Sequence, residues 1–293
     1  QLFRLGADEY RELPWTALIL DEAQFVKNVQ SKGFRCARDF PAAVTFAVTG
    51  TPLENNLMEF WALLAVAAPG LFPDSRRFTE HYRLPIERGG ATERLDQLRR
   101  RAAPFLLRRT KEQVAPELPP KVEQVIEVDL SPRHQQVYQR HLQRERQKIL
   151  GLLQDKRSLD DHRFQILRSL TLLRQLSLDP SLVDESYRDI PSSKLEVAID
   201  RICEIVESGH RVLVFSQFTR FLARARDQLH HLGIAHCLLD GRTKDRSAVV
   251  EAFRTGVAPV FLISLKAGGF GLNLTEADYC FVLDPWWNPA AEA

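Results

Sequence analysis

The chain has 293 residues, of which 44% are hydrophobic and 27% charged, and this balance is typical of a soluble globular protein with room for two domains. A net charge of +2 neither favours nor excludes a nucleic-acid partner, so any basic surface has to be local. Because no apolar run is long enough to span a bilayer and the N-terminus lacks a signal-peptide pattern, we expect no membrane partner and a cytoplasmic (nucleoid-associated) or nuclear location.

Four cysteines lie far apart in the chain, and none is part of a CxxC or Cys/His cluster. They are Cys36, Cys203, Cys237 and Cys280. This spacing supports neither a zinc site nor a disulfide framework, so we expect reduced and mostly buried thiols.

The first predicted strand, Ala17–Leu20, ends in two carboxylates, Asp21 and Glu22. In an open parallel α/β sheet, ligands bind in the crevice beyond the carboxyl ends of the strands. Paired carboxylates at that place suit a metal-bound phosphate, because one can hold Mg²⁺ and the other can orient or deprotonate an attacking water. Taken alone, the four residues from Asp21 to Gln24 favour the simpler alternative of an exposed acidic turn.

The second predicted strand, Val44–Val48, runs into the polar segment TGTPLENN, Thr49–Asn56. In this segment Gly50 permits unusual backbone angles. The alternative to a functional role for this segment is a cap for the helix that follows, with Thr51 as the N-cap and Pro52 at the first helical position. The apolar helix predicted to follow places Leu57, Phe60, Trp61, Leu64 and Ala65 at helical spacing, as in a core.

The sequence DEAQ, followed by Val26-Lys27-Asn28 and then by TGTPLENN, resembles motifs II and III of the SWI/SNF-type (SNF2-family) ATPases, which are double-stranded DNA translocases of helicase superfamily two. The resemblance implies an α/β fold with two RecA-like lobes, each a parallel sheet flanked by helices, plus helical insertions. It also implies ATP and Mg²⁺ as cofactors, double-stranded DNA as a partner and DNA-bound proteins as further partners.

The resemblance divides the chain into three parts. Residues 1–118 correspond to the C-terminal part of the first lobe with a helical insertion at about 57–112. Residues 119–190 contain a linker, a predicted strand at Val122–Leu130 with period-two alternation, and the two helices of the second lobe's insertion. Residues 191–293 correspond to the second lobe, truncated at its C-terminal end. A basic segment of the first insertion, Glu93–Lys111, suits contact with DNA phosphates or bracing of the lobes, although charge runs are more often solvated.

Strands alternate with helices from Pro191 onward, and this order predicts a parallel sheet with right-handed crossovers. Each predicted strand is followed by a polar segment that matches a family motif. The strands and segments are Arg211–Phe215 with SQFT, Ala235–Leu239 with DGRT, Val260–Ile263 with SLKAGGFGLNL, and Tyr279–Leu283 with DPWWNP.

The resemblance assigns roles to individual residues. Asp21 is expected to hold Mg²⁺ and Glu22 to activate water, while Gln24 with Thr49, Gly50 and Thr51 would couple the phosphate to DNA. Two glycines, Gly269 and Gly271, are expected to let the second lobe approach the nucleotide. The residues expected at the DNA backbone are Lys27, Ser216, Gln217, Arg242, Thr243, Ser264, Lys266 and Asn273; for Lys27 a solvated charge is an equal alternative.

The sequence contains no GxxxxGK[ST] phosphate loop, and it stops at Trp286–Ala293, where the family continues into an arginine-bearing segment. We therefore interpret the chain as an internal fragment of a DNA-dependent ATPase, and we expect the fragment alone to be weak or inactive. Two alternatives stay open: a non-catalytic DNA-binding or scaffold module that retains the fold, and a strand-separating helicase. The sequence carries no information on oligomeric state.

Overall fold

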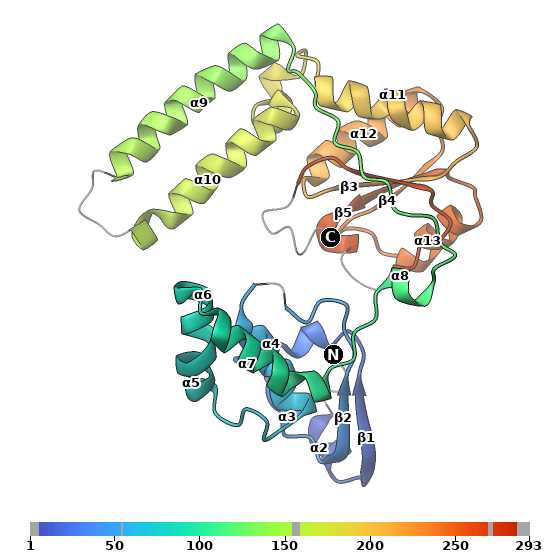
Figure 1. The fold of residues 1–293 in the computed structure, drawn as a ribbon. Helices are drawn as coiled ribbons and strands as arrows, with labels where there is room; N and C mark the ends of the chain where they lie inside the picture. The colour runs from blue at the N-terminus through green and yellow to red at the C-terminus, as the bar shows by residue number, and fades with distance from the viewer. Residues whose placement is uncertain (1–5, 54, 154–158, 269–271, 286–293) are drawn as a thin grey trace. The chain divides into compact units, whose positions relative to one another are not determined.

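The computed structural model describes residues 6–53, 55–153, 159–268 and 272–285 (Figure 1). The chain forms two compact units, Gln1–Val122 and Glu123–Trp286, and each is described here by itself. Within the described ranges, no helix combines the length and the apolar character that crossing a membrane requires.

The first unit contains a pair of parallel strands, β1 (Trp15–Leu20) and β2 (Ala42–Ala47). The crossover between them consists of the short 3₁₀ helix η1 (Ala23–Val26) and the helix α3 (Lys32–Arg38). Both predicted strands are confirmed within two residues. Because the strands run in parallel, the acidic pair after β1 and the TGTPLENN segment after β2 lie at the same edge of the sheet.

Helices make up the rest of the first unit, and its core is largely aromatic. Phe34, Trp61, Phe78 and Tyr82 are buried in one cluster, which confirms the predicted apolar helix as core. The elements are α2 (Ala7–Arg11), α4 (Leu57–Ala67), α5 (Ser75–Phe78), the π-helical turn η2 (Thr79–Arg83), α6 (Leu84–Gly89), α7 (Thr92–Ala102), η3 (Ala103–Phe105) and α8 (Lys111–Val114).

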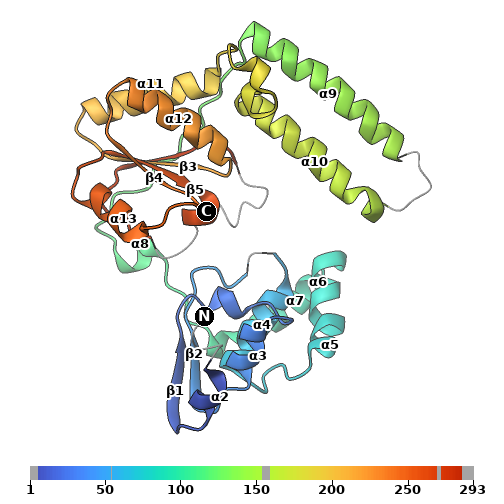
Figure 2. The ribbon, with the colours of Figure 1, turned by 180° about the vertical axis from the view of Figure 1, so that it is seen from behind.

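The second unit is built on a four-stranded sheet in the order β4-β5-β3-β6, and its pairings are parallel, as predicted. Helices α11 (Ser193–Glu207) and α12 (Thr219–His231) cover one face, and helix α13 (Arg246–Arg254) covers the other (Figures 1 and 2). The strands are β3 (Val212–Ser216), β4 (His236–Leu239), β5 (Val260–Ser264) and β6 (Tyr279–Val282), and the short helix α14 (Leu265–Gly268) follows β5.

Alternate residues of the central strand β5 enter two separate cores. Val260 and Leu262 pack with α11 and α12, whereas Phe261 and Ile263 pack with Phe253 of α13. Side chains of a strand point alternately to the two faces, so a strand covered on both faces is apolar throughout. This explains why the continuous apolar run VFLI was a reliable strand signal.

Two long antiparallel helices, α9 (Pro132–Leu153) and α10 (Leu159–Leu178), precede this sheet, and the two helices predicted for this segment are thereby confirmed. They pack against each other, and buried His134 lies with its Nε2 2.5 Å from the carbonyl oxygen of Leu176. The short 3₁₀ helices η4 (Pro180–Leu182) and η5 (Glu185–Tyr187) connect the hairpin to α11.

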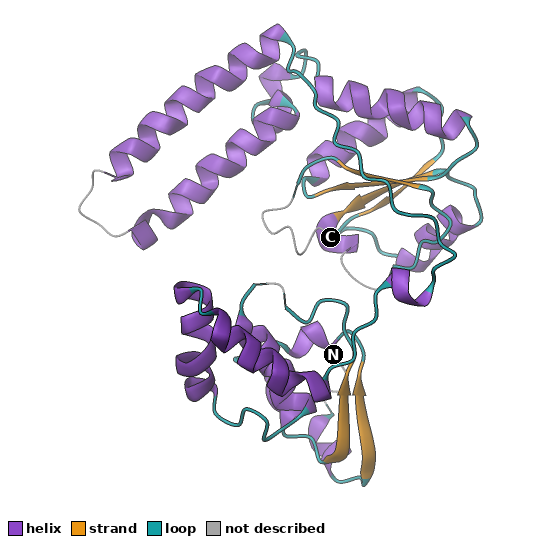
Figure 3. Cartoon of the chain, in the orientation of Figure 1, coloured by secondary structure: helices purple, strands orange, loops and turns teal. Residues whose placement is uncertain are grey.

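Three predictions about local structure are wrong. The segment Val122–Leu130 forms a loop (Figure 3), with the side chains of Val122 and Val125 88% exposed, because alternation marks two faces but supplies no partner strand. The N-cap of α4 is Asn56, not Thr51, since the Asn56 side chain accepts a hydrogen bond from the backbone N–H of Met58. The thiols are not mostly buried: of the four cysteines only Cys237 is buried, and Cys280 is exposed.

Candidate functional site

The chain turns sharply after β1, at the predicted acidic pair. Glu22 has φ 50° and ψ 49°, and it is the only non-glycine residue with positive φ in the described part of the chain. Such a conformation costs about 1–2 kcal/mol for a residue with a side chain. Two hydrogen bonds hold the turn: Glu22 N–H donates to Asp21 Oδ1 (2.9 Å), and Ala23 N–H donates to the carbonyl of Val48 beyond β2 (2.9 Å).

A chain of side-chain hydrogen bonds joins the ends of the two strands. Gln24 Nε2 donates to Glu22 Oε2 (2.6 Å), and Thr49 Oγ1 donates to Gln24 Oε1 (2.7 Å). The backbone N–H of Thr51 in turn donates to Thr49 Oγ1 (3.1 Å). Gln24 is 8% exposed and the other three residues are half-buried, so it is the central amide of the network that is shielded from water, where hydrogen bonds are stronger. The structure therefore brings together four of the residues that the sequence grouped at this site.

Asp21 is exposed, and its Oδ1 accepts the turn hydrogen bond described above. Its second carboxylate oxygen has no hydrogen-bond partner among the described residues. Mg²⁺ is usually bound through one or two carboxylates together with waters and substrate phosphates. The described residues contain no cluster of three or more His, Cys, Asp or Glu side chains, but a single free carboxylate oxygen at a strand end fits this mode of binding.

Two further predicted residues have structural surroundings that the sequence did not indicate. Lys27 Nζ lies 3.2 Å from Glu59 Oε2, each side chain being only 13% exposed, and Asn55 also donates to the Glu59 carboxylate. This ion pair connects the loop after β1 to α4, so the DNA contact of Lys27 stays a prediction with a structural alternative. Gly50 has no positive φ, and no atom lies within 4 Å of an added Cβ, so the structure does not use the conformational freedom that glycine permits here.

In the second unit, the serines that end β3 and β5 are buried. Ser216 is 0% exposed and its Oγ accepts a hydrogen bond from Phe218 N–H (3.0 Å). Ser264 is 3% exposed and its Oγ accepts from Ala267 N–H (3.3 Å). Both hydroxyls therefore hold the loops that follow the strands, and their contact with DNA stays a prediction that this placement does not support.

Arg242 and Lys266, by contrast, are exposed at this edge of the sheet. Asn273 is also exposed, but it lies beside the last residue of α13, because the Arg254 guanidinium donates to the Asn273 carbonyl (2.7 Å). Arg242 projects from a tight turn in which its N–H donates to Asp240 Oδ1 (2.8 Å) and Thr243 Oγ1 accepts from Asp240 N–H (3.0 Å). Since β4 and β5 are neighbours in the sheet, Arg242 and Lys266 follow adjacent strands. The geometry suits an anion that lies across both loops.

A buried carboxylate and two half-buried basic side chains lie beside the end of β6, and the sequence did not lead us to predict them. Asp284 is 2% exposed, and its Oδ2 accepts a hydrogen bond from Gln217 N–H (3.1 Å). Lys194 Nζ donates to the carbonyl of the residue before Asp284 (2.9 Å), and Arg174 of α10 donates to the carbonyl of Pro285. Burial raises the pKa of Asp284 and lowers the pKa of Lys194. Asp284 directly follows a predicted apolar strand, and this position was the sequence signal that could have indicated a buried carboxylate.

The remaining predicted nucleotide-binding residues, Gly269 and Gly271, lie outside the described residues, as does the Trp286-Trp287 pair. The neighbouring Gly268 is described and closely packed. A Cβ at this position would lie 2.4 Å from Ile263 Cγ2 and 3.3 Å from Phe215 Cε1, so only glycine fits here.

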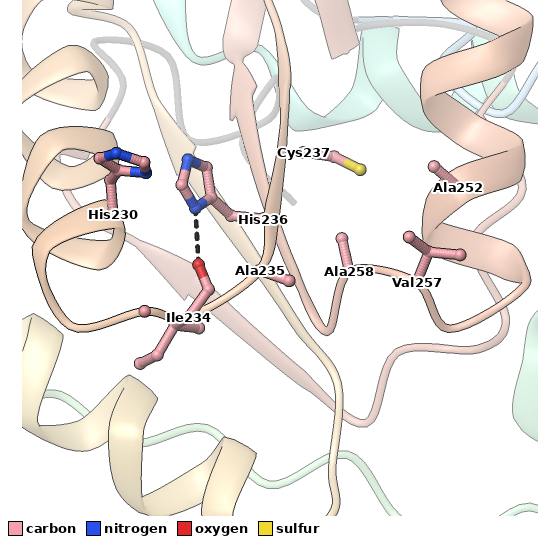
Figure 4. A pocket seen from close by; sticks show the side chains of 9 residues that line it. His230, Ile234, Ala235, His236, Cys237, Ala252, Val257 and Ala258 are labelled. Atoms are coloured by element: carbon pink, nitrogen blue, oxygen red, sulfur yellow. Dashed lines mark hydrogen bonds between the residues drawn. The ribbon is translucent and has the colours of Figure 1, made fainter.

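An open pocket lies at the amino-terminal ends of β4 and β5, away from the loops described above, and its volume is about 530 Å³. Figure 4 shows the side chains that line it. His236 Nδ1 is hydrogen-bonded to the carbonyl of Ile234 (2.8 Å), and His236 and Cys237 point to opposite sides. The other lining side chains are mostly small and apolar, so this pocket offers no converging polar groups for catalysis. Its lining residues are His230, Gly233, Ile234, Ala235, His236, Cys237, Ala252, Val257 and Ala258.

Comparison with known families decides the classification. Residues 4–182 match the SNF2-related domain, and residues 196–293 match the helicase conserved C-terminal domain. The chain belongs to the SNF2 family. This membership confirms the resemblance drawn from DEAQ and TGTPLENN.

Relatives with similar sequences include SNF2-family proteins of eukaryotes and bacteria. The ISWI chromatin-remodeling complex ATPase ISW1 of Saccharomyces cerevisiae is 31% identical over 96% of this chain, which covers 26% of that protein. The human SWI/SNF-related matrix-associated actin-dependent regulator of chromatin subfamily A member 1 is 32% identical over 97% of this chain and 28% of its own length. An uncharacterized ATP-dependent helicase of Mycoplasma pneumoniae is 34% identical over 94% of this chain and 26% of its own length. The chain thus spans about a quarter of the length of these relatives.

The solved Sulfolobus solfataricus SWI2/SNF2 ATPase core in complex with dsDNA has a similar fold. The TM-score is 0.50 at 27% identity, and the match covers 98% of this chain and 62% of the solved one. The same core domain without DNA gives a TM-score of 0.50 at 26% identity. This similarity confirms the predicted α/β fold class, with parallel sheets flanked by helices in RecA-like lobes.

Proposed function

We propose that this chain is part of the motor core of an ATP-dependent double-stranded DNA translocase that displaces or remodels DNA-bound proteins. The observation that carries the proposal is the hydrogen-bond chain from Glu22 through Gln24 to Thr49 and Thr51. A protein that kept the fold only as a scaffold would not need a strained turn and a buried network at a strand end. With double-stranded DNA as its partner, the protein would be located in a nucleoid or a nucleus.

In the proposed reaction, Glu22 orients and deprotonates the water that attacks the terminal phosphate. Gln24 holds the Glu22 carboxylate through a 2.6 Å hydrogen bond, so the direction of that carboxylate depends on the amide. Asp21 would hold Mg²⁺ through its exposed oxygen, and the ion would neutralise charge on the phosphates.

The coupling of hydrolysis to DNA would run through the buried amide of Gln24. The amide donates to Glu22 and accepts from Thr49, so a shift of the loop after β2 changes both hydrogen bonds together. This two-sided arrangement gives a physical route by which a change in the loop after β2 reaches the attacking water.

For DNA binding we propose the exposed side chains of Arg242, Lys266 and Asn273 as contacts to the phosphate backbone. Such contacts position a protein on a duplex without reading its sequence. The buried hydroxyls of Ser216 and Ser264 would hold the loops in shape, and direct contacts by these serines, by Gln217 and by Thr243 would need a rearrangement of the loops.

The test is ATP hydrolysis by the natural full-length protein without DNA, with single-stranded DNA and with duplex DNA, beside the variant Glu22→Gln. We expect duplex DNA to stimulate ATP hydrolysis by the natural protein but not by the variant. Nucleotide binding should persist, because the new amide side chain keeps an oxygen that can accept the hydrogen bond from Gln24. A strand-separation assay in parallel identifies a helicase if it is positive. Absence of hydrolysis with every DNA would refute the motor and favour a scaffold.

A further inference from the structure

Helix α9 is unusually basic for this chain. Its 22 residues include five basic side chains and one carboxylate, whereas the whole chain has a net charge of +2. The basic residues are Arg133, Arg140, Arg144, Arg146 and Lys148, and the carboxylate is Glu145. The excess of positive charge on this one helix is therefore larger than that of the entire chain.

The single carboxylate does not reach the outer surface of the helix. Glu145 is 6% exposed and accepts a hydrogen bond from Ser169 Oγ of α10, and Lys148 Nζ lies 3.4 Å from its Oε2. The Ser169 hydrogen bond is the main cause that lowers the pKa of Glu145, so the group is ionised and its charge faces α10. The outward face of α9 consequently carries no negative charge.

Three arginines on this face form no close ion pair, although the charge of Arg144 helps to lower the pKa of Glu145. Arg133 pairs with Asp189 (2.9 Å), but no carboxylate of the described residues lies within ion-pair distance of Arg140, Arg144 or Arg146. Arg140 and Arg144 are four residues apart, so their like charges are neighbours and destabilise the helix. A bound polyanion would remove this repulsion.

Glutamines occupy most of the remaining outward positions, and all of them are exposed. They are Gln135, Gln136, Gln139, Gln143 and Gln147. Between Gln139 and Lys148 no apolar side chain is exposed, and Leu150, one turn beyond Arg146, is the nearest exposed apolar residue of α9, so the face itself lacks the apolar anchors on which protein–protein contacts usually depend. Arginine and glutamine side chains both donate hydrogen bonds to phosphate oxygens.

We propose that the α9 basic face, defined as Arg140, Arg144 and Arg146 with the five glutamines, is a second binding surface for the phosphate backbone of duplex DNA. It is separate from the strand-end loops that bear Arg242 and Lys266. From Gln136 to Gln147 the face is about 16 Å long, which matches the axial span of about five phosphates of one strand. The inference rests on the proposed function in that it takes duplex DNA as the partner.

The experiment compares two triple variants of the 293-residue chain that remove equal charge. One is Arg140→Gln/Arg144→Gln/Arg146→Gln, and the matched control is Arg188→Gln/Arg201→Gln/Arg226→Gln, at exposed positions elsewhere in the second unit. Gln has nearly the helix propensity of Arg, and circular dichroism checks that both variants fold. Binding to a duplex of arbitrary sequence is measured between about 50 and 200 mM salt, the range over which phosphate contacts have large effects.

We expect the α9 triple variant to reduce the slope of log affinity against log salt by about three, at about one unit for each lost contact. Its affinity at about 100 mM salt should fall at least tenfold, and the matched control should change the slope by less than one. Equal losses in both variants, or no loss in the α9 variant, would overturn the inference. Unchanged DNA binding together with lost binding to polyglutamate would assign the face to an acidic protein instead.

A third variant, Arg242→Gln/Lys266→Gln, separates this inference from the proposed function. Loss of binding in that variant with normal binding by the α9 triple variant overturns only the inference on α9. If the unaltered chain fails to bind duplex even at about 50 mM salt, duplex DNA is the wrong partner and both proposals fail.

Discussion

Thr49 Oγ1 donates a 2.7 Å hydrogen bond to Gln24 Oε1, and this contact joins two residues that lie 25 positions apart at the ends of neighbouring strands. Because Gln24 Nε2 is already engaged with Glu22, the hydroxyl determines which way the buried amide is oriented. The conformation of the loop after β2 and the position of the Glu22 carboxylate are therefore mechanically linked.

The substitution Thr49→Val tests this link. Valine keeps the shape of the side chain but can neither donate nor accept, so the Gln24 oxygen and the Thr51 N–H each lose a hydrogen bond worth about 1–1.5 kcal/mol. If hydrogen bonding by Thr49 positions Glu22 for catalysis, duplex-stimulated turnover of the natural full-length protein should fall about tenfold. Thr49→Ser keeps the hydroxyl and serves as the control; equal rates for the valine and serine variants would show that the contact has no catalytic role.

Gly268 leads to a prediction about stability. In Gly268→Ala the new Cβ would lie 2.4 Å from Ile263 Cγ2, so side chains in the core between the sheet and α13 have to move. Overpacking of this kind costs about 1–3 kcal/mol, which should appear as a lower urea midpoint. The matched control is Gly151→Ala in α9, where no atom lies within 4 Å and alanine favours the helix, so its midpoint should stay or rise. A midpoint for Gly268→Ala as high as that of the control would contradict the packing argument.

Much of the sheet could be predicted from the sequence because its signals are local. The run Val260–Ile263 is apolar throughout, as expected for a strand covered on both faces, and the polar residues at its end mark the edge where sites form. Both Glu22 and Thr49 follow such strands, but their grouping in one site was implied by the resemblance to the SNF2 family.

The sequence did not predict contacts that depend on long-range pairing. The alternation in Val122–Leu130 specifies two faces, but whether a strand forms depends on a neighbouring strand. The ion pair of Lys27 with Glu59 joins residues 32 positions apart, and the burial of Ser216 depends on elements packed around the end of β3. Residue type at a strand end therefore indicates the place of a site, but it does not tell which side chains are exposed there.

A buried ion pair gives a third prediction. Asp179 is 0% exposed, its Oδ1 accepts from Ser181 N–H, and its Oδ2 lies 3.1 Å from Arg224 Nε. Asp179→Ala leaves both donors without this acceptor and should lower the free energy of unfolding by about 3 kcal/mol. Glu204→Ala breaks the exposed pair with Arg201 and should cost less than about 1 kcal/mol. Urea unfolding of both variants measures the difference, and similar losses would mean that the burial of Asp179 does not matter.

The lowered pKa of Glu145 predicts how the free energy of unfolding depends on pH. Its hydrogen bond from Ser169 lowers its folded-state pKa below the ordinary value of 4.5. A lowered carboxyl pKa contributes stability that is complete above the unfolded-state pKa and is lost as the pH falls through the folded-state pKa.

The variant Glu145→Gln cannot titrate at this position, so it isolates that contribution. The unaltered chain should be the more stable of the two at pH 7, and the difference between them should shrink as the pH falls below about 4.5. Exposed Asp184 and Asp278, whose pKa values are also lowered, titrate in both proteins and cancel in the comparison. Urea midpoints measured at several pH values between 7 and about 3 give this difference directly. A difference that stays constant or grows in acid would mean that the Glu145 charge does not stabilise the packing of α9 against α10.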